Sequence, residues 1–353
     1  MNIGIKIKNG INILRERGVS ILVNTALTKK AARKKEGYCY NLPAFAQIEI
    51  TTYCNLRCST CKEFEDEFGT GANYSRHMKF EGFKQILYKL PYLRWIRLNG
   101  VGEPLLNPDL LQMINYATKK GIDVSFFSNA TVLKKDIARK LIESGLKLIL
   151  FSIDGATPEV FEKIRKGAKF NDVIENINGF VKLAEGLKTG APNIIVCTTL
   201  STENIKELPG IVKLVSSLGI RNIIVKKMIP WVESLQDKIV CQEELMILKE
   251  ARELAKESGI NINIGKRLEM RMDNGSQMES NFLACDWPWT STYVSVDGWV
   301  TPCCNIFDPR RINFGNIFTE EFRTIWNKKE MKEFREELKG GLPKVCQISC
   351  MIK

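Results

Sequence analysis

The sequence contains almost no histidine. His77 is the single histidine among 353 residues. Because imidazole is the commonest protein ligand of transition metals, its scarcity limits the kinds of metal site that the chain can build. Cysteine, by contrast, is abundant, with eleven residues. Any metal site in this protein is therefore expected to consist mainly of thiolates.

The sequence also lacks a long apolar run. No uncharged stretch reaches the roughly 18 residues that a membrane-spanning helix needs. The N-terminus does not show the order of a signal peptide, because Arg15, Glu16 and Arg17 interrupt the only early apolar stretch. We therefore expect a cytoplasmic protein without a membrane span. In that compartment thiols stay reduced, so clustered cysteines are expected to bind metal rather than to form disulfides.

The charge is strongly unbalanced. With 52 Lys and Arg against 40 Asp and Glu, the formal charge is +12. Much of the excess lies before residue 40, and the rest is spread as single charges along expected helices. Basic and aromatic residues are not interleaved as in an RNA-stacking sheet, so a nucleic-acid partner is not expected. The basic surface is therefore expected to be a solvated one.

From residue 46 to about 230, short β-branched runs alternate with amphipathic stretches of helical length. The expected strands span residues 47–51, 95–98, 124–127, 148–153, 194–200 and 222–226. Such alternation predicts an α/β fold with a parallel sheet. Six units are too few for an ordinary eight-stranded barrel, which leaves a partial barrel or an open doubly wound sheet. In both, the loops after the strands carry the chemistry.

Four segments are predicted. Residues 1–45 form a basic N-terminal extension with a helix expected over 11–27, and residues 46–230 form the α/β core. Residues 231–280 form a connection with a helix over 243–256 and a strand near 261–264. Residues 281–353 differ in composition, because they contain several tryptophans, a predicted turn at 297–298 and five of the eleven cysteines. This last segment is expected to be a small α+β domain.

Three cysteines follow the first expected strand in a single loop. Cys54, Cys58 and Cys61 have the spacing CxxxCxxC, with no fourth cysteine or histidine nearby. Structural zinc requires four closed ligands and fits this loop poorly. An iron-sulfur cluster bound by three cysteines leaves one iron open to another ligand and fits it better. Three unrelated structural cysteines are the alternative.

A second group of cysteines follows residue 280, namely Cys285, Cys303, Cys304, Cys346 and Cys350. Four thiolates close a tetrahedral zinc site well, so spacing alone leaves zinc open here. The remaining three cysteines, Cys39, Cys197 and Cys241, are isolated and are expected to be buried as small apolar residues.

The CxxxCxxC loop after the first strand of a partial barrel resembles the radical SAM superfamily. The resemblance implies a partial (β/α)6 TIM-like barrel with a 4Fe-4S cluster on Cys54, Cys58 and Cys61. It also implies that S-adenosylmethionine binds the fourth iron. One electron then cleaves the sulfonium, and the resulting 5′-deoxyadenosyl radical takes a hydrogen atom from the substrate.

The later loops are similar to the family's S-adenosylmethionine contacts. The segment 99–106 resembles the GGEP motif, in which Gly102 admits a close backbone approach and Glu103 accepts from an ammonium. Arg165 matches the residue that holds the methionine carboxylate, and a guanidinium fork suits that role. Thr60 departs from the family, which often has an aromatic residue before the third cysteine. The implied cofactor contacts are Thr60, Gly102, Glu103, Pro104, Asn129, Ser152 and Arg165.

The segments 285–289, 297–305, 314–317 and 325–327 resemble the SPASM or twitch extension of radical SAM enzymes. The dense cysteine run of a full SPASM domain is missing, so one auxiliary 4Fe-4S cluster is implied. Its expected ligands are Cys285, Cys303, Cys346 and Cys350, with Cys304 competing with Cys303. Four protein thiolates would leave no open iron, which favours electron transfer.

The resemblance implies a radical SAM oxidoreductase that takes hydrogen from a small or carrier-bound substrate, possibly of sugar type. The auxiliary cluster would accept the remaining electron, and part of the basic surface would meet anionic substrates or an acidic electron donor such as a flavodoxin or ferredoxin. Two alternatives stay open: a peptide- or protein-modifying maturase, and a non-catalytic iron-sulfur redox or regulatory protein. The first 45 residues are too short for the recognition domain that peptide-modifying relatives often carry, which favours the smaller substrate. No catalytic base is assigned from the sequence.

Overall fold

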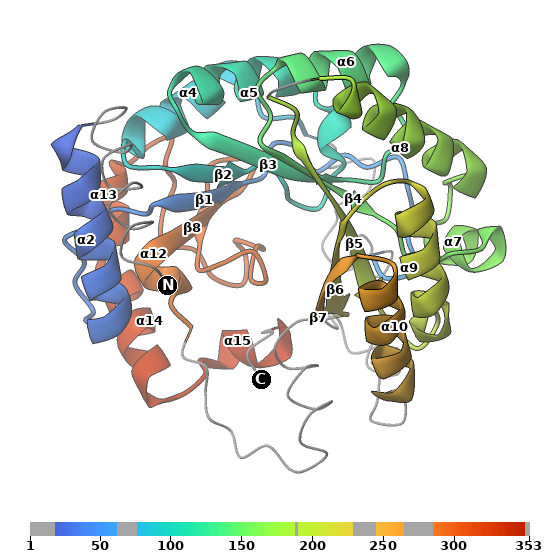
Figure 1. Cartoon of the computed structure of the whole chain (residues 1–353). Coiled ribbons are helices and arrows are strands. Elements are labelled where there is room, and N and C mark those ends of the chain that lie inside the picture. The colour runs from blue at the N-terminus through green and yellow to red at the C-terminus, as the bar shows by residue number, and fades with distance from the viewer. Residues whose placement is uncertain (1–17, 62–75, 188–189, 229–244, 265–284, 350–353) are drawn as a thin grey trace.

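The computed structural model describes residues 18–61, 76–187, 190–228, 245–264 and 285–349. These residues form a nine-stranded sheet in the order β7-β6-β5-β4-β3-β2-β1-β8-β9 (Figure 1). All pairs are parallel except β8 with β9. The strands are β1 (Phe45–Ile48), β2 (Trp95–Arg97), β3 (Asp123–Ser128), β4 (Leu148–Ser152), β5 (Asn193–Leu200), β6 (Asn222–Lys227), β7 (Asn261–Ile264), β8 (Ser291–Val294) and β9 (Val300–Thr301).

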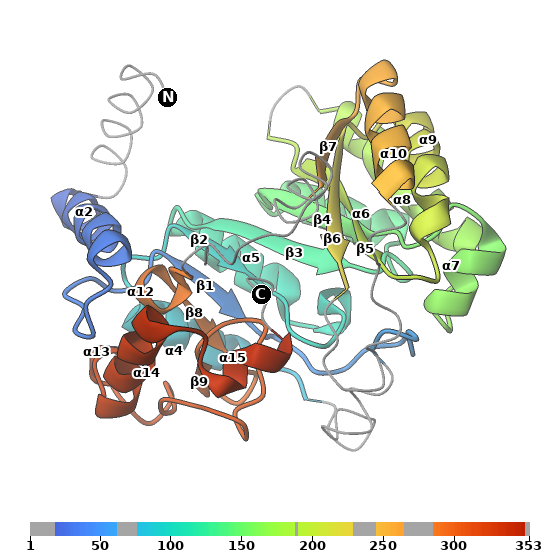
Figure 2. The same ribbon diagram turned by 90° about the horizontal axis from the view of Figure 1, so that it is seen from below.

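Helices cover the convex side of the curved sheet (Figures 1 and 2). The helices of the core are α4 (Phe80–Lys89), α5 (Leu110–Lys119), α6 (Lys135–Glu143), α7 (Pro158–Ile164), α8 (Phe170–Glu185), α9 (Leu208–Ser217) and α10 (Leu245–Glu257), and its loops contain the short 3-10 helices η2 (Pro104–Leu106) and η3 (Ile205–Glu207). Alternate strand residues pack against them, as the edge-to-face contact of Phe151 on β4 with Phe180 on α8 shows. The prediction of an α/β partial barrel is confirmed. The six expected strands all form, and β7 extends the same parallel sheet.

The strand residues that alternate with those facing the helices lie on the concave face of the sheet. In β1 and β2, Gln47 is level with Arg97, and Arg97 is level with Ser125 of β3. Because side chains alternate along a strand, Phe127 lies on the same face as Ser125. The contact between the Arg97 guanidinium and the Phe127 ring agrees with this placement. The inside of the barrel is therefore partly polar and carries charge.

The C-terminal region joins the barrel through β8, which pairs with β1 with Phe45 level with Ser291. It continues with α13 (Phe322–Trp326), α14 (Lys329–Gly340) and α15 (Lys344–Ser349), and α12 (Trp287–Thr290) precedes β8. Figures 1 and 2 place these helices together beside β1 and β8, away from α7 to α10. The predicted limits of the four segments stay predictions, and the limit near residue 280 lies outside the described residues.

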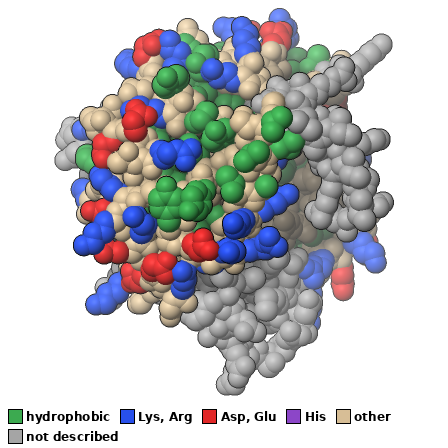
Figure 3. Space-filling model, turned by 90° about the vertical axis from the view of Figure 1, so that its left-hand side faces the viewer, with side chains coloured by type: hydrophobic (Ala, Val, Ile, Leu, Met, Phe, Trp, Pro, Cys, Tyr) green, Lys and Arg blue, Asp and Glu red, His purple; other side chains and the backbone are tan. Residues whose placement is uncertain are grey.

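The described N-terminal helix, α2 (Val19–Lys34), runs seven residues past the predicted end at residue 27. The prediction was wrong here because residues 29–34 consist of lysine, alanine and arginine, which are strong helix formers. Figure 3 shows the face that carries α2, where basic and acidic side chains are interspersed with exposed apolar ones. Within the part of the chain that the structure describes, no helix has the length and apolarity to cross a membrane.

Candidate functional site

The CxxxCxxC loop follows β1 at the carboxyl end of the sheet and is fixed to the end of α7. The Arg57 N–H donates to the Lys166 carbonyl at 2.9 Å, and the Ser59 N–H donates to the Ile164 carbonyl at 2.8 Å. Within the loop, the Cys61 N–H donates to the Cys58 carbonyl at 2.9 Å. A segment far along the chain therefore holds the three cysteines in place.

The thiols of this loop are poor acids without a bound cation. Burial raises the pKa of the Cys54 thiol to about 11 and that of Cys58 to about 12. The charge of Glu103 adds to the first shift, while the Arg165 guanidinium opposes both. Both thiols are protonated near neutral pH, so a metal that binds them must displace their protons. A positively charged iron centre is the kind of group that makes three neighbouring thiolates stable.

The loop after β2 lies directly against the cysteine loop. The Glu103 N–H donates to the Tyr53 carbonyl at 2.9 Å. A Cβ atom at Gly102 would lie 2.5 Å from the Tyr53 oxygen and 2.6 Å from the Thr51 oxygen, closer than real Cβ atoms come. Only glycine permits this approach of the two backbones. Pro104 then begins η2 and is buried.

Glu103 carries a buried carboxylate between three loops. Its Oε1 accepts from Ser128 Oγ at 2.9 Å and from the Leu105 N–H at 3.1 Å, and its Oε2 accepts from the Asn129 N–H at 2.7 Å. Burial raises the pKa of Glu103 to about 7 despite these donors. A carboxylate has about four acceptor positions, so one remains for a ligand such as an ammonium. A cation there would favour the ionised form.

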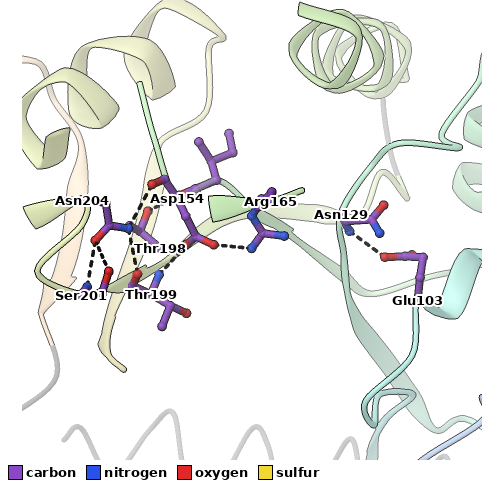
Figure 4. A network of polar contacts seen from close by, with 9 residues as sticks. Glu103, Asn129, Asp154, Arg165, Thr198, Thr199, Ser201 and Asn204 are labelled. Carbon is purple, nitrogen blue, oxygen red and sulfur yellow. Dashed lines mark hydrogen bonds and ion pairs between the residues drawn. The ribbon is translucent and has the colours of Figure 1, made fainter. Parts of the chain in front are cut away.

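Arg165 forms a buried ion pair that the sequence did not reveal. Its Nη2 lies 2.6 Å from Asp154 Oδ2, and the two side chains are 12% and 5% exposed. Asp154 also accepts from the Thr199 N–H at 2.8 Å. In Figure 4, Arg165 lies between Asp154 on one side and Asn129 and Glu103 on the other. The Arg165 Nε is buried without an acceptor, so part of the guanidinium is available to a ligand.

The other expected contacts lie at the same edge. Asn129 follows β3, and its Nδ2 lies 4.0 Å from Cys54 Sγ and 3.1 Å from Asn55 Oδ1. Ser152 is the last residue of β4 and is half-buried, as is Thr60 in the cysteine loop. The structure therefore brings the seven expected cofactor contacts to the side of the barrel that holds the three cysteines. The sequence missed Ser128 and Asp154, which hold Glu103 and Arg165.

The second group of cysteines divides into two. Cys285, Cys303 and Cys346 line one pocket whose other walls are mostly apolar and include Trp287 and Phe334. Cys350, the fourth expected ligand, lies outside the described residues. The pocket gathers thiols from α12's N-terminal end, the turn after β9 and α15.

Cys304 lies apart from that pocket's lining and is subject to the charges of Arg97 and Lys226. Burial raises the pKa of the Cys304 thiol, and these two cations oppose the shift. Adjacent cysteines in the chain thus face different surroundings.

Across the described residues, no three His, Cys, Asp or Glu side chains converge closely enough to surround a single metal ion.

Comparison with known proteins decides the family. Residues 48–215 match the model of the radical SAM superfamily, and residues 285–351 match that of an iron-sulfur cluster-binding domain, SPASM. The chain belongs to the radical SAM superfamily. This radical SAM chain carries its SPASM domain C-terminal to the barrel, as the sequence indicated. It is a radical SAM enzyme. Its cofactors are S-adenosylmethionine, the 4Fe-4S cluster of the radical SAM domain and auxiliary iron-sulfur clusters of the SPASM domain.

Two relatives align over most of the radical SAM chain. A tungsten-containing aldehyde ferredoxin oxidoreductase cofactor-modifying protein from Pyrococcus furiosus is 27% identical over 86% of each chain. An AdoMet-dependent heme synthase from Methanosarcina barkeri is 26% identical over 85% of this chain and 87% of its own.

Solved structures show the same fold. SuiB from Streptococcus suis, bound to its precursor peptide SuiA, has a TM-score of 0.67 at 15% identity, covering 88% of this chain and 70% of SuiB. The protein anSMEcpe with bound AdoMet and a peptide has a TM-score of 0.64 at 16% identity, covering 86% and 85%.

Proposed function

We propose that this radical SAM enzyme is an oxidoreductase that takes a hydrogen atom from a small or carrier-bound substrate, with an auxiliary cluster accepting the remaining electron. When bound, S-adenosylmethionine and its cluster supply a 5′-deoxyadenosyl radical through one-electron reduction. A flavodoxin or ferredoxin is the proposed electron donor. The observation that carries the proposal is the gathering of three thiols, the Glu103 carboxylate and the unsatisfied Arg165 Nε at one edge of the sheet.

We assign the cluster that binds S-adenosylmethionine to Cys54, Cys58 and Cys61. Glu103 receives the methionine ammonium at its remaining acceptor position, and Arg165 receives the methionine carboxylate while Asp154 fixes its orientation. Gly102 and Pro104 shape the loop that presents Glu103. The remaining contacts are proposed to be Thr60 at the adenine, Ser152 at the ribose, and Asn129 beside Cys54.

We assign one auxiliary cluster to Cys285, Cys303, Cys346 and Cys350. The shared pocket of the first three supports this assignment, and so does the position of Cys304 outside its lining. An apolar lining of this kind excludes water from the cluster and lowers the local dielectric, which tunes its reduction potential.

A small or carrier-bound substrate is favoured over a peptide. Two relatives that align over most of this chain are named for cofactor modification and heme synthesis. The structural neighbours with bound peptides are 15% and 16% identical, a level of likeness that speaks to the fold alone.

The decisive experiment is anaerobic reconstitution of the full chain, followed by iron analysis and reduction with dithionite in the presence of S-adenosylmethionine. Two 4Fe-4S clusters give about eight irons per chain. Cys58→Ala is expected to retain about four irons and to lose 5′-deoxyadenosine formation. The control, Cys39→Ala, should keep the iron content of the wild type and should still form 5′-deoxyadenosine. If the wild type with full iron content releases no 5′-deoxyadenosine, the proposal fails, and the protein is a non-catalytic redox or regulatory protein.

A further inference from the structure

Two cations on the concave face of the barrel share one aromatic ring. Arg97 ends β2 and Lys226 lies near the end of β6, on strands separated by three others in the sheet. The Arg97 guanidinium lies 5.2 Å from the centroid of the Phe127 ring, and Lys226 Nζ lies 4.4 Å from it. Arg97 also contacts the Phe45 ring at 5.7 Å.

Among the described residues, neither side chain has a hydrogen bond or an ion pair with a carboxylate. The Arg97 Nε is buried and has no acceptor. Glu49 follows Gln47 by two residues, but its carboxylate is hydrogen-bonded to other groups. Its carboxylate oxygens accept from the backbone N–H groups of Val101 and Val296, each at 3.1 Å.

Two other arginines of the described chain each have strong polar partners, although Arg165 Nε and Arg335 Nη2 are, like Arg97 Nε, buried without an acceptor. Arg165 pairs with Asp154 at 2.6 Å. Arg335 lies over the Trp326 ring and donates to three backbone carbonyls, those of Pro288, Gly37 and Trp326, each at 2.8 Å. Arg97 has ring contacts without any such acceptor, so it differs from the arginines that support the fold.

This arrangement is electrostatically incomplete. Two like charges near one ring repel each other, and the cation-π contacts with that ring do not neutralise either charge. An anion in contact with both cations would remove the repulsion and supply the missing acceptor for Arg97.

We propose that Arg97 and Lys226 bind an anionic group of the substrate, a carboxylate or a phosphate, beside Phe127 inside the barrel. The planar fork of Arg97 suits the paired oxygens of either group, and Lys226 adds a point charge. Both residues lie near the carboxyl ends of their strands, the end from which the cysteine and Glu103 loops emerge. The anion anchors the substrate within the barrel, on the side where the cofactor loops gather. This inference rests on the proposed function, because it names the class of molecule that the same enzyme takes.

The test measures anion binding to the reconstituted, unreduced full chain. Inorganic phosphate and acetate are titrated separately by calorimetry at constant ionic strength. We expect saturable binding of one of them to the wild type, and at least tenfold weaker binding to Arg97→Met and to Lys226→Met. Methionine keeps the apolar stem beside the ring. The matched controls Arg139→Met and Lys213→Met change exposed residues on α6 and α9 and should bind within twofold of the wild type.

Tighter binding of phosphate identifies a phosphorylated substrate, and tighter binding of acetate identifies a carboxylated one. The proposal is overturned if neither anion binds the wild type saturably, or if both methionine variants bind as well as the controls. Arg97→Lys, which keeps the charge, provides a second test should Arg97→Met fail to fold, and it should retain part of the affinity. The titration needs no reductant and no turnover. Its failure is therefore distinguishable from failure of the radical chemistry, which the release of 5′-deoxyadenosine reports.

Discussion

Replacing Arg165 with glutamine tests whether this residue binds cofactor or only supports the fold. The substitution removes one partner of an ion pair whose side chains are 12% and 5% exposed. Breaking a buried pair leaves an uncompensated charge, here on Asp154, and costs about 3–5 kcal/mol. The apo protein should therefore lose about that much free energy of unfolding. This part of the effect says nothing about S-adenosylmethionine.

The cofactor effect is separate. Loss of a charge-assisted hydrogen bond to a carboxylate costs about 1.5–3 kcal/mol, or roughly tenfold to a hundredfold in the dissociation constant. The double variant Arg165→Gln with Asp154→Asn separates the two effects, because it removes the lone buried charge. We expect it to regain most of the lost stability while S-adenosylmethionine still binds weakly.

The assays are urea unfolding of the apo chain and equilibrium dialysis of S-adenosylmethionine with the reconstituted chain. Arg139→Gln, an exposed position on α6, is the control and should change neither quantity. If the double variant recovers cofactor affinity together with stability, the reasoning fails, and Arg165 acts only through the fold.

Three further predictions follow from contacts in the site. Cys303→Ala should reduce the iron content from about eight to about four per chain, whereas Cys304→Ala should keep about eight, and the reverse result would contradict the assignment. The pKa of Glu103 lies near 7, above its unfolded value, so the fold holds an extra proton between pH 4.5 and 7 and the apo chain loses stability as pH rises through that window. Glu103→Gln should flatten this part of the stability profile in denaturant titrations, and an unchanged slope would show that another group titrates there. Gly102→Ala should destabilise the chain by about 1–3 kcal/mol and weaken S-adenosylmethionine binding, since its Cβ meets the cysteine loop. Thermal melts of the apo chain measure the first effect, and Gly179→Ala, whose Cβ has open space, should be neutral or stabilising in them.

Much of the barrel could be predicted from the sequence, because its elements depend on local pattern. The β-branched run of β5 favours a strand by itself, and the alternation of such strands with helices along the chain favours parallel pairing. The position of the cysteine loop follows from the same rule, since parallel strands bring their carboxyl ends to one edge. The contact between the Gly102 loop and the Cys54 loop is a consequence of that order.

Pairings across long distances in the chain were not accessible to the same reasoning. That β8 pairs with β1 depends on which sheet edge the C-terminal region covers, and local pattern does not contain this choice. The ion pair of Arg165 with Asp154 is likewise not predictable from the sequence, because Asp154 there has only the pattern of a turn residue after a strand.

The identity of the chemistry came from the residues themselves. The spacing of Cys54, Cys58 and Cys61 restricts these thiols to one short loop in any fold, and a thiolate loop without histidine favours iron and sulfur. Tertiary structure decided what no spacing could. It separated Cys303 from its neighbour Cys304, and it brought Arg97 and Lys226 to one ring. The physical reason is that coordination within a loop depends on chain geometry over a few residues, whereas the surroundings of a side chain depend on the packing of strands far apart in the sequence.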